Sequence, residues 1–397
     1  MNKVPKIALL IETSTSWGSG LIQGVADYIH ANDDWQVLVA PWGRYERITL
    51  PTHWIGDGVI ARVVYPELAD QLVARNIATV NVSWYRHSEG RIPQCTVDET
   101  LVAGMAAEFF IDRGFRQFAY CGSSFRPNHD DLLEKSFTAY LRSKAFKCHS
   151  LAPKAGHDVY LPSEADHKQL MQWLRDLPKP IGLLAFDSLQ ARQVVEACQL
   201  GKIVVPHEVA VLGGEHDLLS CTISKPQLSS IDQSPRRVGW AAAELLAKLM
   251  AGEPVPKQRI LLPPARIITR QSTDAVAVDD DMLALAIRFI HQHSQERIQV
   301  EDILDAAPIS RRALEKGFRK CLGRSPAEAI RRARVDRAVQ LLCDTSWAMP
   351  RIAVACGFER PELLTRAFRR ELKMTPSEFR RQHLMGRLDA DLPQNSC

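Results

Sequence analysis

Two helix–turn–helix patterns follow one another near the C-terminus, between Val300 and Arg381. The first reads VEDILDAAPISRRALEKGFRKCLG, and the second reads MPRIAVACGFERPELLTRAFRRELKMTPSEFR. In each pattern a short apolar helix leads through a tight turn to a helix with basic residues at i, i+3 and i+4, which lie on one helix face. A long basic helix that starts at Pro326 joins the two patterns. The spacing predicts an all-α unit.

The positive charge of the chain is concentrated in the same segment. Residues 1–281 carry 29 Lys and Arg against 32 Asp and Glu, a balance of −3, whereas residues 282–385 carry 20 against 12, a balance of +8. A basic excess over helix–turn–helix patterns is the electrostatic footprint of phosphate binding. A solvated helical surface that is basic by chance is the alternative interpretation.

The residues before this unit alternate apolar runs with helical patterns. We predict strands over 6–11, 35–40, 58–63, 78–84, 117–122, 181–186 and 209–214. The predicted helices cover 21–31, 67–75, 102–113, 132–144, 166–177, 188–200 and 237–251. Strands separated by helices predict βαβ units and parallel sheets covered on both faces. A chain of 397 residues is too long for one core, so two or three domains are expected.

Composition and cysteine usage exclude several classes of protein. The content of 46% hydrophobic and 24% charged residues is that of a globular chain, and no apolar run approaches the length of a membrane span. The start, MNKVPKIALLIETS, fits a first strand better than a signal peptide. Nine cysteines without a CxxC pair or a suitably spaced histidine predict neither disulfides nor a zinc site. We expect a cytoplasmic protein without metal, cofactor or membrane partner.

Polar and aromatic residues collect at the carboxyl ends of the predicted strands, where open parallel sheets bind ligands. Besides Thr15, Trp42, Ser83 and Asp232, this set supplies our candidate ligand residues, which are Ser16, Trp17, Arg62, Trp84, Arg126, Asp187, Glu215, His216 and Gln233. Carboxylates, amides, arginines and tryptophans together suit a sugar, whose hydroxyls need polar partners and whose apolar face stacks on indole. Each residue taken alone could equally be a loop group that caps a helix.

Two alternative chemistries find little support. GSGLIQG (18–24) follows a strand, but its glycines are spaced GxGxxxG, and the next strand ends without an acidic residue, so a dinucleotide site is not expected. No GxSxG, P-loop or HExxH occurs, and no spacing of Ser, His and Asp points to a catalytic set. We therefore predict that the chain is not an enzyme.

The predicted sheet region resembles the effector-binding core of the LacI/GalR regulators, which are similar to periplasmic sugar-binding proteins. The matching stretches are DSLQARQVVEACQLGKIVVPHEVAVLGGEHD (187–217), LSSIDQSPRRVGWAAAELLAKLMAGE (228–253) and LPPARIITRQST (262–273). The resemblance implies an α/β sensor of two lobes, like a type I periplasmic binding protein, with a sugar held between them. LacI relatives carry their DNA-binding helices at the N-terminus, whereas this sequence starts directly on the first core strand.

The helical segment resembles an AraC-family DNA-binding domain through GRSPAEAIRRARVDRAVQLL, IAVACGF and TRAFRRELKMTPSEFR. Ser310 is expected to cap the first reading helix, with Leu314 and Phe318 in its core. By the resemblance, the DNA-contacting residues are Arg311, Arg312, Glu315 and Lys316 in the first unit and Arg360, Glu362, Leu363 and Arg366 in the second. Family members often have an aromatic pair where this chain has Leu363 and Leu364.

A sugar-binding core followed by an AraC-type domain is the order found in XylR-like xylose operon regulators. The stretches IALLIETSTSWGSGLIQGV, WIGDGVIAR and AAEFFIDRGFRQFAYCG resemble that group. Three positions depart from its pattern. Glu215 and His216 replace the usual Asp followed by Asn or Asp, and Leu133 replaces a common arginine.

These resemblances imply a sugar-responsive transcription regulator, an activator by expectation, with xylose as the first choice of ligand. The implied partners are double-stranded DNA, a monosaccharide, a second copy of the chain and RNA polymerase. We expect a sensor over 1–273, a linker over 274–281, a DNA-binding domain over 282–385 and a flexible tail over 386–397. The alternatives are a sugar-binding protein or a sugar-active enzyme without regulatory DNA binding.

Overall fold

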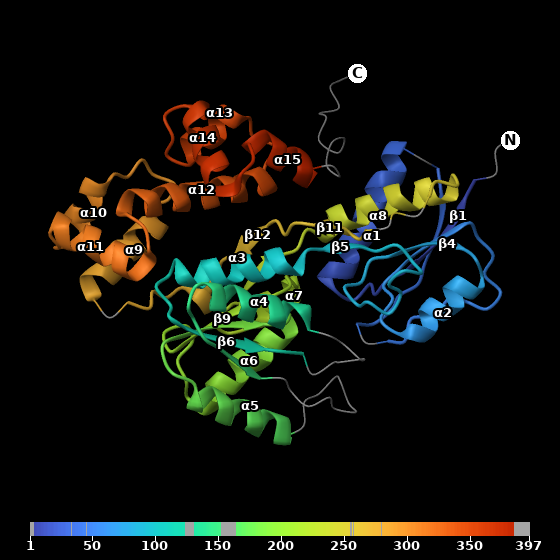
Figure 1. Ribbon diagram of the computed structural model, residues 1–397, viewed down its shortest axis with the longest axis horizontal. Helices are drawn as coiled ribbons and strands as arrows, with labels where there is room; N and C mark the ends of the chain where they lie inside the picture. Colours follow the sequence, from blue (N-terminus) through green and yellow to red (C-terminus); the bar gives the residue numbers. More distant parts are fainter. Residues whose placement is uncertain are drawn as a thin grey trace.

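A computed structural model describes residues 4–32, 34–44, 46–123, 131–151, 164–254, 256, 258–278 and 280–384. Two α/β lobes are followed by an all-helical unit that lies against one side of them (Figure 1). The predicted fold class is therefore confirmed. The candidate residue Arg126 and the predicted tail over 386–397 lie outside the described residues. No helix within the described ranges is both long and apolar enough to cross a membrane.

The first lobe is a parallel sheet in the order β2-β1-β3-β4. Its strands are β1 (Lys6–Leu10), β2 (Gln36–Val39), β3 (Gly58–Ala61) and β4 (Ala78–Asn81). The helices α1 (Ser16–Asn32), α2 (Pro66–Ala74) and α8 (Pro235–Met250) pack around it. Helix α1 begins five residues earlier than predicted, because Thr15 Oγ1 accepts a hydrogen bond from Gly18 N at 2.9 Å and satisfies a donor of the first turn.

The second lobe is a six-stranded sheet in the order β12-β10-β9-β8-β6-β7, parallel apart from the β10–β12 pair. Its strands are β6 (Gln117–Cys121), β7 (Cys148–Leu151), β8 (Ile181–Ala185), β9 (Val209–Gly213), β10 (Ser229–Asp232) and β12 (Arg266–Ile268). Its helices are α3 (Glu99–Ile111), α4 (Leu132–Ser143), α5 (Glu164–Asp176), α6 (Ser188–Gly201) and α7 (Leu218–Ile223). The short strands β5 (Cys95–Val97) and β11 (Ile260–Leu262) pair where the chain passes between the lobes.

The helical unit has two small cores that share one long helix. Its elements are α9 (Asp281–Gln292), α10 (Val300–Ala306), α11 (Arg311–Leu322), α12 (Pro326–Asp344), α13 (Met349–Ala355), α14 (Pro361–Leu372) and α15 (Pro376–Leu384). The first half of α12 packs with α9–α11, and its second half packs with α13–α15. Ser310 caps α11, as predicted, and Gly323 ends it with φ of +68°. Each helix–turn–helix unit is thus a separately packed module.

Helices α1 and α8 come from distant parts of the chain and cross in close contact at two glycines. A Cβ atom at Gly24 would overlap the carbonyl oxygen of Arg236, and one at Gly239 would overlap the carbonyl oxygen of Leu21. The glycine-rich stretch that superficially resembles a dinucleotide turn therefore serves helix packing. This contact fixes the returning α8 on the first lobe.

The substitution Gly24→Ala tests that contact. We expect the free energy of unfolding of the sensor to fall by about 1–3 kcal/mol, because the added methyl group must push the two helices apart. Urea titration followed by tryptophan fluorescence measures the change. The control is Gly104→Ala in α3, where the nearest atom to the new Cβ is a Tyr140 ring carbon at 3.3 Å. An equal loss in both variants would contradict the explanation.

Candidate ligand cleft and nucleic-acid interface

Buried carboxylates and two arginines meet between the lobes. Asp187 follows β8 and Glu215 follows β9, and both are at least 95% buried. Arg44, from a loop of the first lobe, places Nη2 3.2 Å from Asp187 Oδ2 and 3.3 Å from Glu215 Oε1. Arg62, after β3, bonds through Nη1 to Glu12 Oε1 at 2.5 Å. Both arginines therefore hold carboxylates, and Arg44 does so across the two lobes.

Aromatic rings form a wall beside these charges. The rings of Trp17 and Trp84 meet edge to face with centroids 6.0 Å apart, and Trp84 meets Phe186 at 6.0 Å. The guanidinium of Arg62 lies over the Trp84 ring, 4.6 Å from its centroid, as in a cation–π contact. Arg62, Trp17 and Trp84, chosen from their places at strand ends, thus come together in one cluster with Asp187's neighbour Phe186.

Several buried polar atoms of this cluster lack a hydrogen-bond partner within the described part of the chain. They are Glu12 Oε2, Arg62 Nε, Trp17 Nε1, Trp84 Nε1 and Gln233 Oε1. Gln233 is positioned by its amide nitrogen, which donates to Gly214 O at 2.7 Å. Three of these five atoms are donors and two are acceptors. A ligand rich in hydroxyl groups could satisfy both kinds, since each hydroxyl both donates and accepts.

The other candidate residues have different contacts. Ser16 joins the lobes a second time, because its N donates to Asp217 Oδ2 at 3.2 Å and its Oγ accepts from Leu218 N at 2.9 Å. His216 is half-buried, and its Nδ1 lies 2.8 Å from Ser230 Oγ, on the side of β10. Ser83 is a structural residue, since its Oγ donates to Val63 O at 3.0 Å.

Sequence reasoning missed two residues of the cluster, Glu12 and Arg44. Glu12 lies two residues beyond β1 and is 1% exposed, and a buried carboxylate this close to a strand end was a usable signal. Arg44 lies in a loop without hydrophobic periodicity. Nothing in the local sequence distinguishes it from Arg47, whose side chain is 64% exposed.

Burial controls the ionisation of the acid nearest Arg44. Desolvation raises the pKa of Glu215 to about 7; Arg44 opposes this rise and the neighbouring Asp187 adds to it. Burial lowers the pKa of His216. Burial therefore favours the protonated form of Glu215 and the neutral form of His216.

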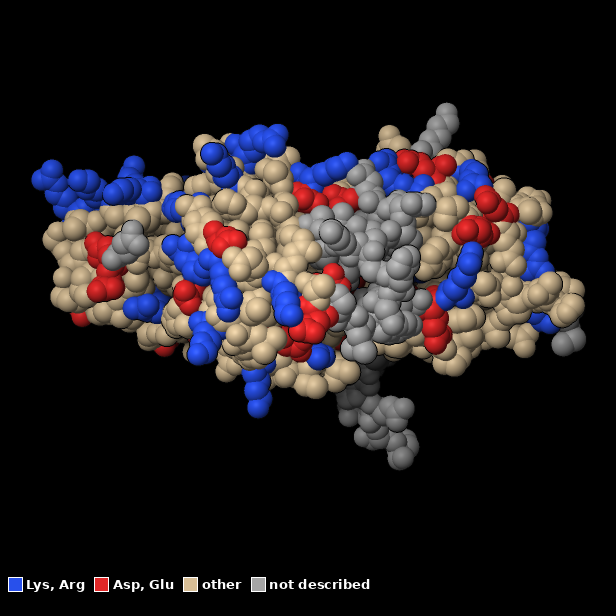
Figure 2. Space-filling view, turned by 90° about the horizontal axis from the view of Figure 1, so that it is seen from below, with Lys and Arg blue, Asp and Glu red and all other residues tan. Residues whose placement is uncertain are grey.

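The reading helix of the first unit presents a basic face. Leu314 and Phe318 of α11 are fully buried, as predicted, while Arg311, Arg312 and Lys316 are exposed and Glu315 is half-exposed. Arg311 also pairs with Glu301 at 2.7 Å. Figure 2 shows Lys and Arg side chains gathered at the end of the molecule that carries α10 and α11.

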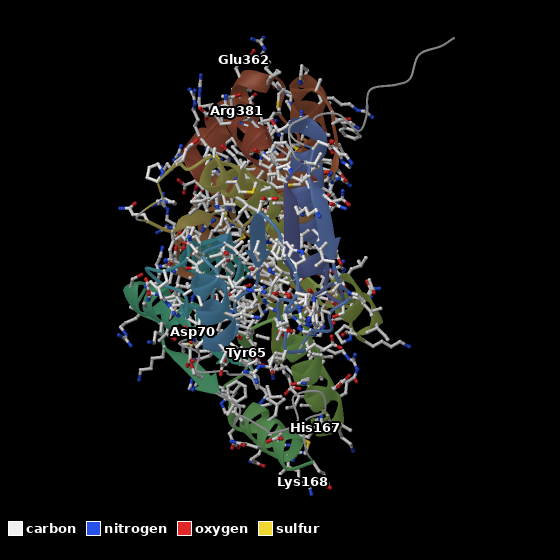
Figure 3. All side chains as sticks on the ribbon, turned by 90° about the vertical axis from the view of Figure 1, so that its right-hand side faces the viewer. Tyr65, Asp70, His167, Lys168, Glu362 and Arg381 are labelled. Atoms are coloured by element: carbon white, nitrogen blue, oxygen red, sulfur yellow. The ribbon has the colours of Figure 1, made fainter. Side chains whose placement is uncertain are left out.

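The second unit repeats this arrangement. Leu364 and Phe368 of α14 are buried, Gly357 makes the turn with φ of +70°, and Leu363 is 38% exposed. Arg360, Glu362 and Arg366 are exposed. Glu362 and Arg381 lie at one end of the molecule, opposite His167 and Lys168 of α5 (Figure 3). The two basic helices therefore have exposed outer faces, whereas the cluster of carboxylates and indoles is buried in the sensor.

The arginines of α12 have structural partners. Arg331 Nε bonds to Glu371 Oε1 at 2.7 Å, and Arg334 Nη2 donates to Ile298 O at 2.6 Å. Arg332 pairs with Asp336 at 3.2 Å. Arg331 and Arg334 thus tie α12 to its neighbours, whereas the Arg332–Asp336 pair lies within α12.

Comparison with known proteins matches both parts of the chain. Residues 107–273 match a periplasmic binding protein-like domain, and residues 303–382 match a helix-turn-helix domain. A xylose operon regulatory protein of Haemophilus influenzae is 29% identical over 94% of this chain and 98% of its own length. That of Escherichia coli K12 is 28% identical over 94% of this chain and 96% of its own length.

Solved structures agree. A xylose-binding transcription activator xylR superposes with a TM-score of 0.62 at 26% identity, over 96% of this chain and 98% of that one. A LacI family transcriptional regulator of Enterococcus faecium with bound ribose has a TM-score of 0.53 over 68% of this chain and 98% of its own, but at 18% identity it shows the fold alone.

The fold, the cleft and the paired helix–turn–helix units define a ligand-sensing, DNA-binding transcription regulator. The near full-length matches are specific to one order of domains, a periplasmic-binding-protein-like sensor before an AraC-type unit. Over almost its full length the chain is similar to the xylose operon regulatory proteins.

The raised pKa of Glu215 predicts a pH dependence of sensor stability. A carboxyl group whose pKa is higher in the folded state stabilises the fold fully below its unfolded pKa, and this contribution is lost as pH rises through the folded pKa. We expect Glu215→Gln to be more stable relative to the natural chain at pH 8 than at pH 5, with the change spread between the unfolded pKa of 4.5 and the folded pKa of about 7. Thermal unfolding at both pH values measures it. Glu164→Gln, at an 85% exposed side chain, should show no such change.

Proposed function

We propose that the cleft binds a monosaccharide, with D-xylose as the first choice, and that the bound sugar controls DNA binding by the helical unit. The observation that carries the proposal is the set of unpartnered donors and acceptors on Glu12, Trp17, Trp84 and Gln233 beside two indole rings in edge-to-face contact. The arginines are paired with carboxylates, which favours an uncharged ligand. The names of the relatives support xylose in particular.

The candidate residues keep the roles that the sequence proposed for them. Trp17, Arg62, Trp84, Asp187, Glu215 and Gln233 contact the sugar directly, and Ser16 and His216 lie at the edge of the site. Exposed residues of α11 and α14 contact DNA, with Arg366 as the foremost base-reading side chain. An arginine that binds guanine with two hydrogen bonds discriminates by about 1–3 kcal/mol.

We further propose that the regulator is an activator that acts as a dimer in the cytoplasm and contacts RNA polymerase. In support of a dimer, α7 exposes three apolar side chains, Leu218, Leu219 and Ile223, at 56%, 72% and 60%. Exposed apolar patches commonly mark protein interfaces. We retain the division into a sensor over 1–273, a linker over 274–281 and a DNA-binding domain over 282–385.

A thermal-shift experiment tests the ligand. D-xylose at 100 times its Kd should stabilise the folded chain by about 2.7 kcal/mol through mass action, and D-glucose at the same concentration should do so less. Trp84→Ala should abolish the shift, while Trp54→Ala, a tryptophan outside the cluster, should keep it. The proposal fails if no pentose or hexose of a panel raises the unfolding temperature.

A binding titration tests the DNA-reading face. Arg366→Ala should weaken binding to a selected operator duplex by about 1–3 kcal/mol and relax the preference at one base pair. Arg142→Ala, on α4 of the sensor, is the control and should leave the affinity unchanged. Equal losses on operator and random duplexes would assign Arg366 to the phosphate backbone instead.

A further inference from the structure

Helix α12 lies along the second lobe and joins the two reading units. With 19 residues it is about 27 Å long, so its two ends rest on different parts of the sensor. Strand β12 approaches its C-terminal end, and α3 approaches its N-terminal end. Figure 1 shows α12 above β12 and α3. The orientation of both reading helices therefore depends on how α12 is held.

At the C-terminal end of α12, Arg266 of β12 forms an ion pair with Asp344, the last residue of that helix. Arg266 Nη2 bonds to Asp344 Oδ1 at 2.5 Å, and Nη1 bonds to Oδ2 at 2.6 Å. The Arg266 side chain is 16% exposed, and that of Asp344 is 54% exposed. Two parallel bonds between a guanidinium and a carboxylate fix direction as well as distance. This pair therefore sets the angle at which α12 leaves β12.

At the N-terminal end of α12, Asp112 follows the last residue of α3 and pairs with arginines of the helical unit. Arg324 Nη2 lies 2.5 Å from Asp112 Oδ1, and Arg332 Nε lies 4.0 Å from Oδ2. Arg324 also approaches Glu108 at 3.6 Å. The Asp112 side chain is 12% exposed, so water screens these charges only in part.

Between the two ion-pair sites, the surfaces of the sensor and of the helical unit do not pack against each other. A cavity of about 760 Å³ lies there, lined by Phe109, Ile267, Ile287, Phe318 and Val339 among others. Apolar packing in the middle of this interface is therefore incomplete. The ion pairs at the two ends must supply much of what holds α12 in place.

One of these sites is connected to the ligand cleft. Glu215 of the cleft is followed directly by His216, whose Nδ1 lies 2.8 Å from Ser230 Oγ on β10. Strand β10 pairs with β12, and Asp232 lies opposite Arg266 in the register. Movement of the segment after β9 can thus reach Arg266 through a single strand.

We propose that Arg266 and Asp344 are positioning residues of the regulator, with Asp112 and Arg324 as their counterpart at the other end of α12. They hold both reading helices at a defined angle to the second lobe. Through β10 and β12 they make that angle depend on the state of the cleft. The last step rests on the proposed sugar-controlled function.

Two single charge-reversal variants and the double variant that combines them test the proposal in the full-length chain. The variants are Asp344→Arg, Arg266→Asp and the double variant with the charges exchanged. The readout is the ratio of affinities, with and without D-xylose, for a duplex selected by the natural chain. Coupling between sites commonly amounts to 5–150-fold, so we expect each single variant to lower this ratio by about fivefold or more and the exchanged pair to restore most of it.

The matched control is the pair Arg91–Asp70 on the first lobe, an arginine–aspartate contact of 2.5 Å. Asp70→Arg and Arg91→Asp should leave the ratio unchanged. A single variant at Arg266 or Asp344 that keeps the full ratio, or an exchanged pair that restores none of it, would overturn the proposal.

A second readout separates this proposal from the identity of the ligand. Amide hydrogen exchange in α12 and β12, without sugar or DNA, should be faster in Asp344→Arg than in the natural chain and return in the exchanged pair. Unchanged exchange would overturn the role of the ion pair. If D-xylose has no effect on the natural chain, the proposed ligand fails, and the exchange experiment alone decides whether Arg266 positions α12.

Discussion

The closed arrangement of the two lobes depends on the guanidinium of Arg44. Asp187 and Glu215 are buried near each other on the second lobe, and two like charges in a poorly hydrated site repel strongly. Arg44 comes from the first lobe and lies within 3.3 Å of both carboxylates, so it offsets their repulsion only while the lobes stay together. Ser16 adds hydrogen bonds to α7 at the same boundary. The contact between the lobes and the pairing of these carboxylates with Arg44 thus depend on each other.

Most strands that could be predicted from sequence are buried, although the mostly exposed β2 was also predicted and the buried β10 was not. Strands β1, β3, β8 and β9 are continuous apolar runs, whereas β7 reads CHSL and is half-exposed, and β5, β11 and β12 have three residues each. Those short strands are stabilised by pairing with neighbouring strands, so the local sequence pattern could not predict them. Residues at the ends of buried strands, such as Asp187, were found for the same reason, while Arg44 was missed because its place depends on a loop that folds across to the other lobe. The helical unit was the most predictable part, since caps, turns and apolar positions there all indicate the same structure.

The basic residues of the helical unit fall into two groups, those paired within the protein and those exposed on its surface. From sequence, the arginines of α11, α12 and α14 all fit a phosphate-binding surface. In the structure, Arg331, Arg332 and Arg334 are engaged inside the protein, and Arg324 holds the unit to the sensor. Charge counts could not separate these groups, because a cation that binds DNA and a cation that binds a neighbouring carboxylate look alike in a sequence. The proposed DNA contact would use the exposed cations of α11 and α14.

A ligand can shift the lobes only by binding one arrangement better than the other. The unpartnered atoms of Glu12, Trp17 and Trp84 belong to the first lobe, Gln233 follows the last parallel strand of the second, and Phe186 closes the wall from the second lobe. A small sugar can reach all of them only while the lobes are closed. Each buried polar atom left without a partner costs about 1–3 kcal/mol, so two or three sugar hydroxyls would supply a differential affinity as large as most known allosteric couplings. Arg44 thus holds the lobes together around buried polar atoms that have no partner among the described residues, and the proposed sugar would supply those partners.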